Sequence, residues 1–161
     1  MNRVYTELAE RIRGEAQDLD RVVQRAEAAW AQARRMSDVD AYVDSTALNL
    51  HSFYSGLERL FELIVRHVDR AVPGGDTWHR DLLDLVAQDL VDVRPAVVSQ
   101  SSRLALDEFR RFRHLVRNVY TMNLVPEKMT GLMTVLPALW PTLRAELLAF
   151  ADFLEALAQT D

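Results

Sequence analysis

One twelve-residue segment gathers the side chains best suited to act on a phosphate group. Residues 109–120, FRRFRHLVRNVY, contain four arginines and one histidine but no acid, in a chain with a formal net charge of −5. At helical spacing the segment has an apolar face, Phe109, Phe112, Val116 and Val119, and a cationic face, Arg110, Arg113, His114 and Arg117. The pattern therefore predicts a helix that buries one stripe and presents a cationic stripe.

The chemistry open to the cationic stripe is limited. Guanidinium groups bind phosphate oxygens in a fork geometry, and an imidazole exchanges protons near neutral pH. Together they suit cleavage of an RNA phosphodiester: arginine balances the charge of the transition state, and histidine acts as acid or base at the 2′-hydroxyl or the leaving oxygen. No metal ion is needed for that reaction.

A solvated arginine face is the alternative interpretation. Arginine is common throughout this chain, in which Lys128 is the only lysine. Elsewhere, however, the predicted helices alternate charges along their exposed faces, as in residues 7–15 and 62–70. The unmixed charge of residues 109–120 favours a function over a merely solvated face.

The same segment resembles a known family. Residues 113–120, RHLVRNVY, look like the Arg-Asn-x-x-x-His-x-Tyr signature of HEPN-domain proteins, specifically the HepT-like toxins encoded beside minimal nucleotidyltransferases. Histidine and asparagine are exchanged, because His114 directly follows Arg113 and Asn118 stands at the later histidine position. YVDSTALNLHSFYSGLERLFE, TWHRDLLDLVAQDL and VRPAVVS resemble the preceding helices of that family, so the resemblance covers most of residues 38–130.

The resemblance implies an all-α fold, an antiparallel bundle of about five helices, and a metal-independent ribonuclease toxin that uses no cofactor. It implies a homodimer in which two motif helices form a composite cleft for RNA. There Arg113 and His114 would be catalytic, and Arg110, Arg117 and Asn118 would bind the phosphate or RNA. The implied partner is a nucleotidyltransferase antitoxin that transfers AMP from ATP to the motif tyrosine, here Tyr120.

Two other functions stay open at this point. The first is a catalytically inactive HEPN protein that docks on a nucleotidyltransferase and helps to hold its substrate, which the acidic net charge and the displaced histidine favour. The second is a purely structural helical dimer, in which acids would mix with the arginine stripe at the interface.

Composition bounds the remaining possibilities. With 161 residues, 49% of them hydrophobic and 27% charged, the chain is expected to form one domain over residues 1–161. The absence of cysteine excludes disulfides and thiolate metal sites and fits a cytoplasmic setting. The N-terminus lacks the apolar stretch of a signal peptide, and residues 132–140 are too short to span a bilayer. We expect no membrane and no DNA partner.

Helical periodicity dominates the chain. Residues 4–33 predict one long helix or two nearly collinear helices. A second helix is expected to start at a Ser37 cap and to end at Pro73-Gly74-Gly75, and a third to run from an Asp76 cap through Leu90. A fourth, carrying the motif, should begin near Ser101 or Ser102, and a last one after Pro126 should be kinked at Pro137 and Pro141.

Other candidate residues are weaker. His51, Tyr54 and Glu58 lie on successive turns of the second predicted helix, and Glu58 is positioned to pair with an arginine of the motif. His67 is expected to be solvated, and His79 to pack locally against Trp78. The acids at 81, 84, 89 and 92 indicate a solvated face. The four histidines lack a recognisable metal-ligand spacing, and Gly74 and Gly75 end a helix instead of cradling a nucleotide.

Overall fold

The computed structural model of the chain describes residues 2–118 and 126–160, except for the side chains of residues 117 and 118. These residues form five α-helices without a β-strand, which confirms the predicted all-α bundle. The helices are α1 (Arg3–Arg35), α2 (Asp40–Ile64), α3 (Trp78–Val86), α4 (Gln100–Asn118) and α5 (Glu127–Thr160), and a π-helical turn, η1 (Val65–Asp69), follows α2 directly. Within the described ranges, no helix is both long and apolar enough to cross a bilayer.

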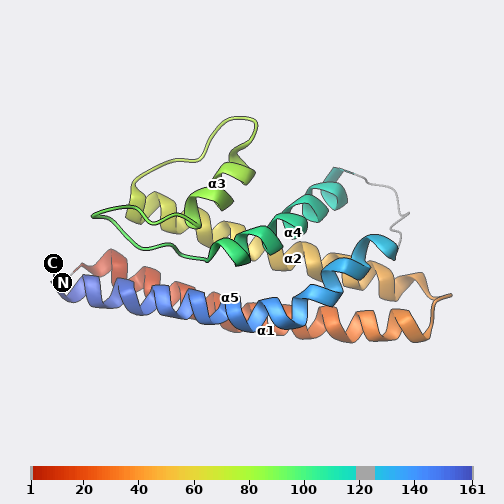
Figure 1. Cartoon of the computed structure of the whole chain (residues 1–161). Helices are drawn as coiled ribbons and strands as arrows, with labels where there is room; N and C mark the ends of the chain where they lie inside the picture. The colour runs from red at the N-terminus through yellow and green to blue at the C-terminus, as the bar shows by residue number, and fades with distance from the viewer. Residues whose placement is uncertain (1, 119–125, 161) are drawn as a thin grey trace.

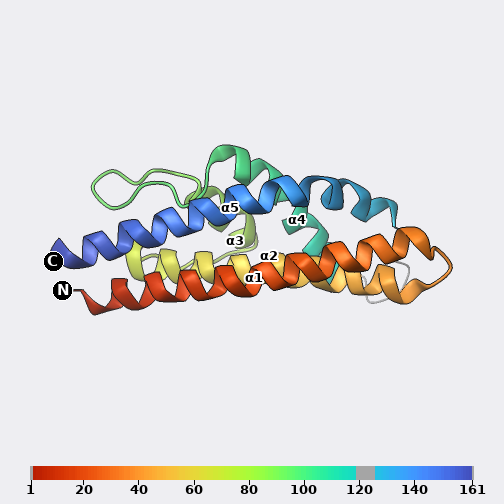
Figure 2. The ribbon, with the colours of Figure 1, turned by 90° about the horizontal axis from the view of Figure 1, so that it is seen from below.

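Three long helices form the body of the molecule. α1 runs antiparallel to both α2 and α5 and packs against each of them, so the two ends of the chain lie close together (Figures 1 and 2). α4 packs across α2 and α5, and α3 packs on α2 and α4. The short helices therefore form a second layer on one side of the long ones, as Figure 1 shows.

Aromatic packing holds α4 in place. The ring of Phe109 on α4 meets Phe53 of α2 edge-on, with centroids 5.4 Å apart, and Phe53 in turn meets Trp140 of α5 at 5.8 Å. Trp140 Nε1 donates to Asp20 on α1 over 2.6 Å. Since all three rings are buried, this chain of contacts fixes the rotation of α4 and decides which of its faces points outward.

Polar contacts fix the ends of the second layer. Ser99 caps α4, because its Oγ accepts from the backbone N–H of Ser102, and Glu146 of α5 accepts from the Ser99 backbone and the Ser102 hydroxyl. Between α3 and α4 the buried Arg94 donates to both carboxylate oxygens of Asp69, at 2.6 and 2.9 Å. Arg94 thereby ties the connection between these helices to the π-helical turn.

α1 is a single helix that passes through Gly14 without interruption, which is one of the two predicted forms. Several other predicted boundaries are wrong. α2 begins after Val39, with no side-chain cap from Ser37. The helical segment formed by α2 and η1 is ended by Arg70, whose φ of 58° is left-handed. This end comes before Pro73-Gly74-Gly75, which were expected to end the helix. α3 follows Thr77 instead of an Asp76 cap and ends at Val86 instead of Leu90.

The last helix runs continuously through both of its internal prolines, Pro137 and Pro141. Figure 1 shows its first part inclined to the remainder, in the bent form expected of a helix that contains prolines. The fourth helix begins at Gln100, one residue before the predicted start.

Candidate functional site

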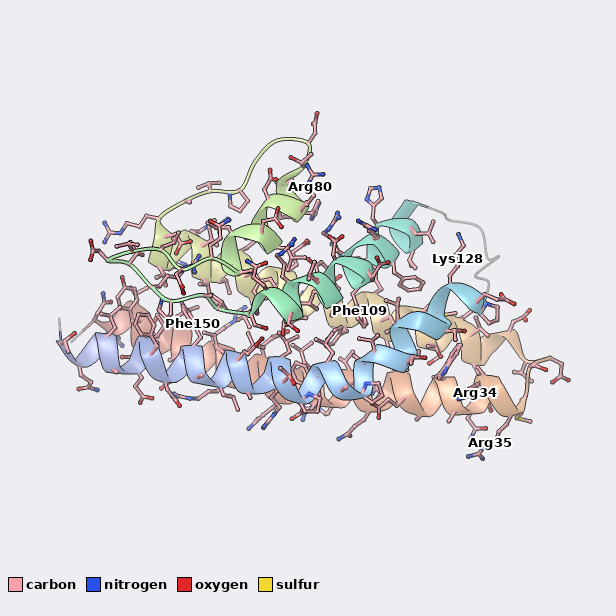
Figure 3. All side chains as sticks on the ribbon, viewed as in Figure 1. Arg34, Arg35, Arg80, Phe109, Lys128 and Phe150 are labelled. Carbon is pink, nitrogen blue, oxygen red and sulfur yellow. The ribbon has the colours of Figure 1, made fainter. Side chains whose placement is uncertain are left out.

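The faces predicted for the motif helix are present in the described part of α4. Phe109, which Figure 3 labels, and Phe112 are buried, and Val116 packs against the core. Arg110 and Arg113 are half-buried and His114 is exposed. The helix therefore buries the predicted stripe and turns its cationic residues away from the core.

These cationic residues line a pocket of about 190 Å³ between the start of α3 and the second half of α4. Arg110, Arg113 and His114 form the α4 wall. The opposite wall consists of Asp76, Thr77, His79 and Arg80, and Figure 3 shows Arg80 projecting from α3. Pockets for drug-sized ligands measure roughly 300–1,000 Å³, so this one suits a small anionic group such as one phosphate.

A buried carboxylate holds two of the residues that line the pocket. Glu58 of α2, whose side chain is 4% exposed, accepts from Arg113 Nη1 at 3.0 Å through one oxygen and bonds His79 Nδ1 at 2.8 Å through the other. Arg113 Nε also donates to the Ser55 hydroxyl at 2.8 Å. The predicted pairing of Glu58 with a motif arginine is confirmed, whereas its bond to His79 was not predicted.

The arginine stripe is not unmixed in three dimensions. Arg110 donates to Asp107 one turn earlier on α4 at 2.9 Å, and Arg111 pairs with both Asp107 and Glu108. Acids just outside residues 109–120, together with Glu58 from another helix, therefore oppose the guanidinium charges. An arginine carries five N–H donors, so these contacts use only part of its capacity to bind an anion.

Tyr54 of α2 is a buried neighbour of Glu58. It is 1% exposed, and burial raises the pKa of its hydroxyl, with the charge of Glu58 raising that pKa further. The phenol therefore stays protonated over the whole physiological range. Tyr54 is a buried neutral neighbour of the Glu58 carboxylate and has no place among the proton carriers of the pocket.

The remaining candidates mostly match their expected surroundings. His67 is exposed, and His79 packs on Trp78 with ring centroids 3.6 Å apart. Of the acids expected on a solvated face, Asp81, Asp89 and Asp92 are exposed, and Asp84 is half-buried and pairs with Arg103 at 2.7 Å. Over residues 2–118 and 126–160, no group of three or more histidines and acids is arranged to hold a metal ion.

Two predicted site residues are only partly placed: Arg117 and Asn118 belong to the last turn of α4, but their side chains lie outside the described residues. Tyr120, the predicted AMP acceptor, and Val119 lie wholly outside the described residues. Conversely, the pocket brings in Thr77 and Arg80, which the sequence did not single out, and His79, which was assigned only to local packing. No local signal in the sequence could have found them, because they reach the pocket only through the packing of α3 on α4.

The comparisons with known proteins identify the family. A family model described as "HepT-like protein" matches residues 45–154, a span that contains α3, α4 and the whole pocket. No curated protein and no solved structure matches the chain. Since the matched span covers more than half of the sequence and includes the motif helix, the chain belongs to the HepT-like family.

Proposed function

We propose that this HepT-like protein is a metal-independent endoribonuclease, the toxin of a toxin–antitoxin pair. The observation that carries the proposal is the pocket itself, which sets an imidazole, that of His114, beside the guanidinium groups of Arg110 and Arg113. Cleavage of an RNA phosphodiester needs groups that bind the phosphate and a group that transfers a proton, and this pocket contains both.

The arginines have the task of holding the phosphate. Arg113 is fixed from two sides by Ser55 and Glu58, and Arg110 is fixed by Asp107. Guanidinium groups held in this way lose little freedom when the anion arrives and oppose its growing charge as the pentavalent state forms. In this arrangement the acids act as supports for the cationic groups.

His114 has the task of moving a proton. It is exposed on the pocket wall, where an RNA strand can reach it. As acid or base it would act at the 2′-hydroxyl or at the departing 5′-oxygen, and the products would be a 2′,3′-cyclic phosphate and a 5′-hydroxyl. Attack by the 2′-oxygen also explains why RNA, and not DNA, would be the substrate.

The proposed assembly and its control rest on the resemblance of the motif segment to HepT-like toxins. In this proposal two subunits bring their motif helices together, so that two copies of Arg110, Arg113, His114 and Arg117 surround the scissile phosphate, with Asn118 at the helix end. A nucleotidyltransferase antitoxin then transfers AMP from ATP to Tyr120. The added phosphodiester charge beside the arginines would block the RNA site.

A second candidate is favoured by the ion pairs. Glu58 pairs with Arg113 and Asp107 pairs with Arg110, and Asp76 also lines the pocket. The formal charge of the pocket is therefore lower than the stripe alone implies. Such a site would serve an inactive HEPN module that docks on a nucleotidyltransferase and helps to hold its substrate. This candidate predicts partner binding without RNA cleavage.

The deciding experiment expresses the chain alone and then tests the purified protein on RNA in the presence of EDTA. Growth arrest, together with RNA fragments that end in a cyclic phosphate, supports the toxin. Intact RNA, with retained binding to a nucleotidyltransferase encoded by the adjacent gene, supports the docking module instead.

A further inference from the structure

The pocket contains a second histidine that the motif does not account for. His79 stands on the α3 wall, across the hollow from the wall that holds His114, and its side chain is 27% exposed. Cleavage of RNA needs two proton transfers, one away from the 2′-hydroxyl and one toward the leaving 5′-oxygen. One pocket thus holds as many imidazoles as the reaction has proton transfers.

The surroundings of His79 set which of its nitrogens carries the proton. A carboxylate that is ion-paired with arginine can only accept hydrogen bonds, so Nδ1 of His79 donates to Glu58 Oε2 at 2.8 Å. In the neutral ring this leaves the lone pair on Nε2, which points away from Glu58. The Trp78 ring, whose centroid lies 3.6 Å from that of the imidazole at an interplanar angle of 31°, further restricts the rotation of the imidazole.

This arrangement is typical of an oriented general base. A carboxylate that holds the far nitrogen of an imidazole selects the tautomer and stabilises the cation that forms when the near nitrogen takes a proton. Glu58 is buried and anchored by Arg113, so its position is well determined. His114 comes from a different helix and is exposed, where it can serve the opposite end of the same phosphate.

We propose that His79 is the general base of the RNA cleavage reaction and that Glu58 is its positioning residue, an inference that rests on the proposed ribonuclease function. His79 Nε2 takes the proton of the 2′-hydroxyl, the 2′-oxygen forms a bond to phosphorus, and the bond from phosphorus to the 5′-oxygen breaks. The imidazolium of His114 gives its proton to that oxygen. One proton is taken and one is given, so the two rings exchange protonation states and no other reactant is consumed.

Replacing the leaving atom separates the two roles. An RNA that carries sulfur in place of the 5′-bridging oxygen, at a cleavage position mapped on ordinary RNA, releases a thiolate that departs without a proton. Such a substrate still needs the base but no longer needs the acid. The rates of variants on the oxygen and sulfur substrates therefore identify which histidine does which task.

His79→Asn is the informative variant, because the asparagine amide can still donate to Glu58 while the Nε2 base is gone. We expect it to lower the cleavage rate at least about 100-fold on both substrates. His114→Ala should lose at least about 100-fold on the oxygen substrate and regain most of that loss on the sulfur substrate. His67→Asn, at an exposed histidine outside the pocket, is the matched control and should cleave both like the wild type.

The outcomes that overturn the inference are distinct from failure of the proposed function. Wild-type protein that cuts neither RNA contradicts both proposals. Wild-type cleavage with an equally active His79→Asn, or rescue of His79→Asn by the sulfur substrate, contradicts the role of His79 alone. Should His79→Asn melt well below the wild type, His79→Gln, whose amide also donates, takes its place and the same two rates decide.

Discussion

Arg113 on α4 and Glu58 on α2, 55 positions apart in the sequence, form an ion pair of 3.0 Å whose carboxylate is almost fully buried. Because the same carboxylate also holds His79 of α3, three helices meet at one acid. Removal of that charge leaves the half-buried guanidinium of Arg113 without its counter-ion, which costs more than the loss of a surface pair.

We therefore expect Glu58→Gln to lower the free energy of unfolding by about 3 kcal/mol. Urea denaturation followed by circular dichroism measures this change. Glu108→Gln is the matched control on α4, because Glu108 and its partner Arg111 are both mostly exposed, and it should change stability by less than about 0.5 kcal/mol. Equal effects of the two substitutions would contradict the supporting role of Glu58.

Tyr54 should make the free energy of unfolding fall at alkaline pH. Burial raises the pKa of its hydroxyl above the ordinary value of 10.0, so the unfolded chain loses this proton at a lower pH than the folded chain. The stabilisation is complete below about pH 10 and declines as the pH rises beyond it, since the unfolded state then binds fewer protons. Tyr54→Phe should remove this dependence.

The measurement compares urea midpoints of the wild type and Tyr54→Phe at pH 8 and pH 11. We expect the wild type to lose more stability between these values than the variant does. Parallel losses in the two proteins would show that Tyr54 titrates in the folded state as it does in the unfolded chain.

The sequence predicted the fold class well because helical periodicity is a local signal. The stripe containing Phe109, Phe112 and Val116 follows from spacing alone. The burial of the two phenylalanines is confirmed, and Val116 is partly buried against the core. Helix ends were predicted less well. α2 starts without a side-chain cap, and its end depends on the π-helical turn and on the Asp69 contact with Arg94, which joins residues 25 positions apart.

The candidate site was predictable only in part, because sequence spacing reports on one helix and not on contacts between helices. Arg110, Arg113 and His114 share one helix, so their common face could be inferred from α4 alone. His79 and Arg80 reach the pocket through the packing of α3 on α4, which no pattern within residues 76–81 encodes. The pairing of Glu58 with a motif arginine was predicted, whereas Asp107 was missed because it lies just before the twelve-residue segment.

The regulatory half of the proposal predicts a covalent adduct on Tyr120. Incubation with the nucleotidyltransferase encoded by the adjacent gene and ATP should add AMP units to the chain, detected by mass spectrometry. Tyr120→Phe should abolish the adduct, while Tyr42→Phe, at a half-buried tyrosine of α2, should keep it. An adduct on another residue, or none with a transferase active on other substrates, would contradict this mode of neutralisation.

The composite site predicts a two-fold dimer. One motif helix offers few groups to surround a phosphate, and the net charge of −5 repels RNA over much of the remaining surface. Pairing two stripes roughly doubles the local positive charge, and the distant acids are then screened beyond a Debye length of about 10 Å. Light scattering at micromolar concentration should report a dimer.

Like charges that face each other at the dimer interface should make the protein respond to anions. The melting temperature should rise more in phosphate than in chloride of equal ionic strength, and Arg110→Gln should reduce that gain. Arg25→Gln, at an exposed arginine of α1, should leave it unchanged. A monomer with no specific gain in phosphate would argue against a shared cleft.

The rate of RNA cleavage by the wild type and by His114→Ala, in EDTA and at matched protein concentration, tests the central claim most directly. His114 lines the pocket from the exposed side of α4, so its truncation should leave the melting temperature and RNA binding nearly unchanged. The account predicts that the variant is slower by about two to four orders of magnitude. A His114→Ala protein that is equally stable and cuts RNA at the wild-type rate would contradict it.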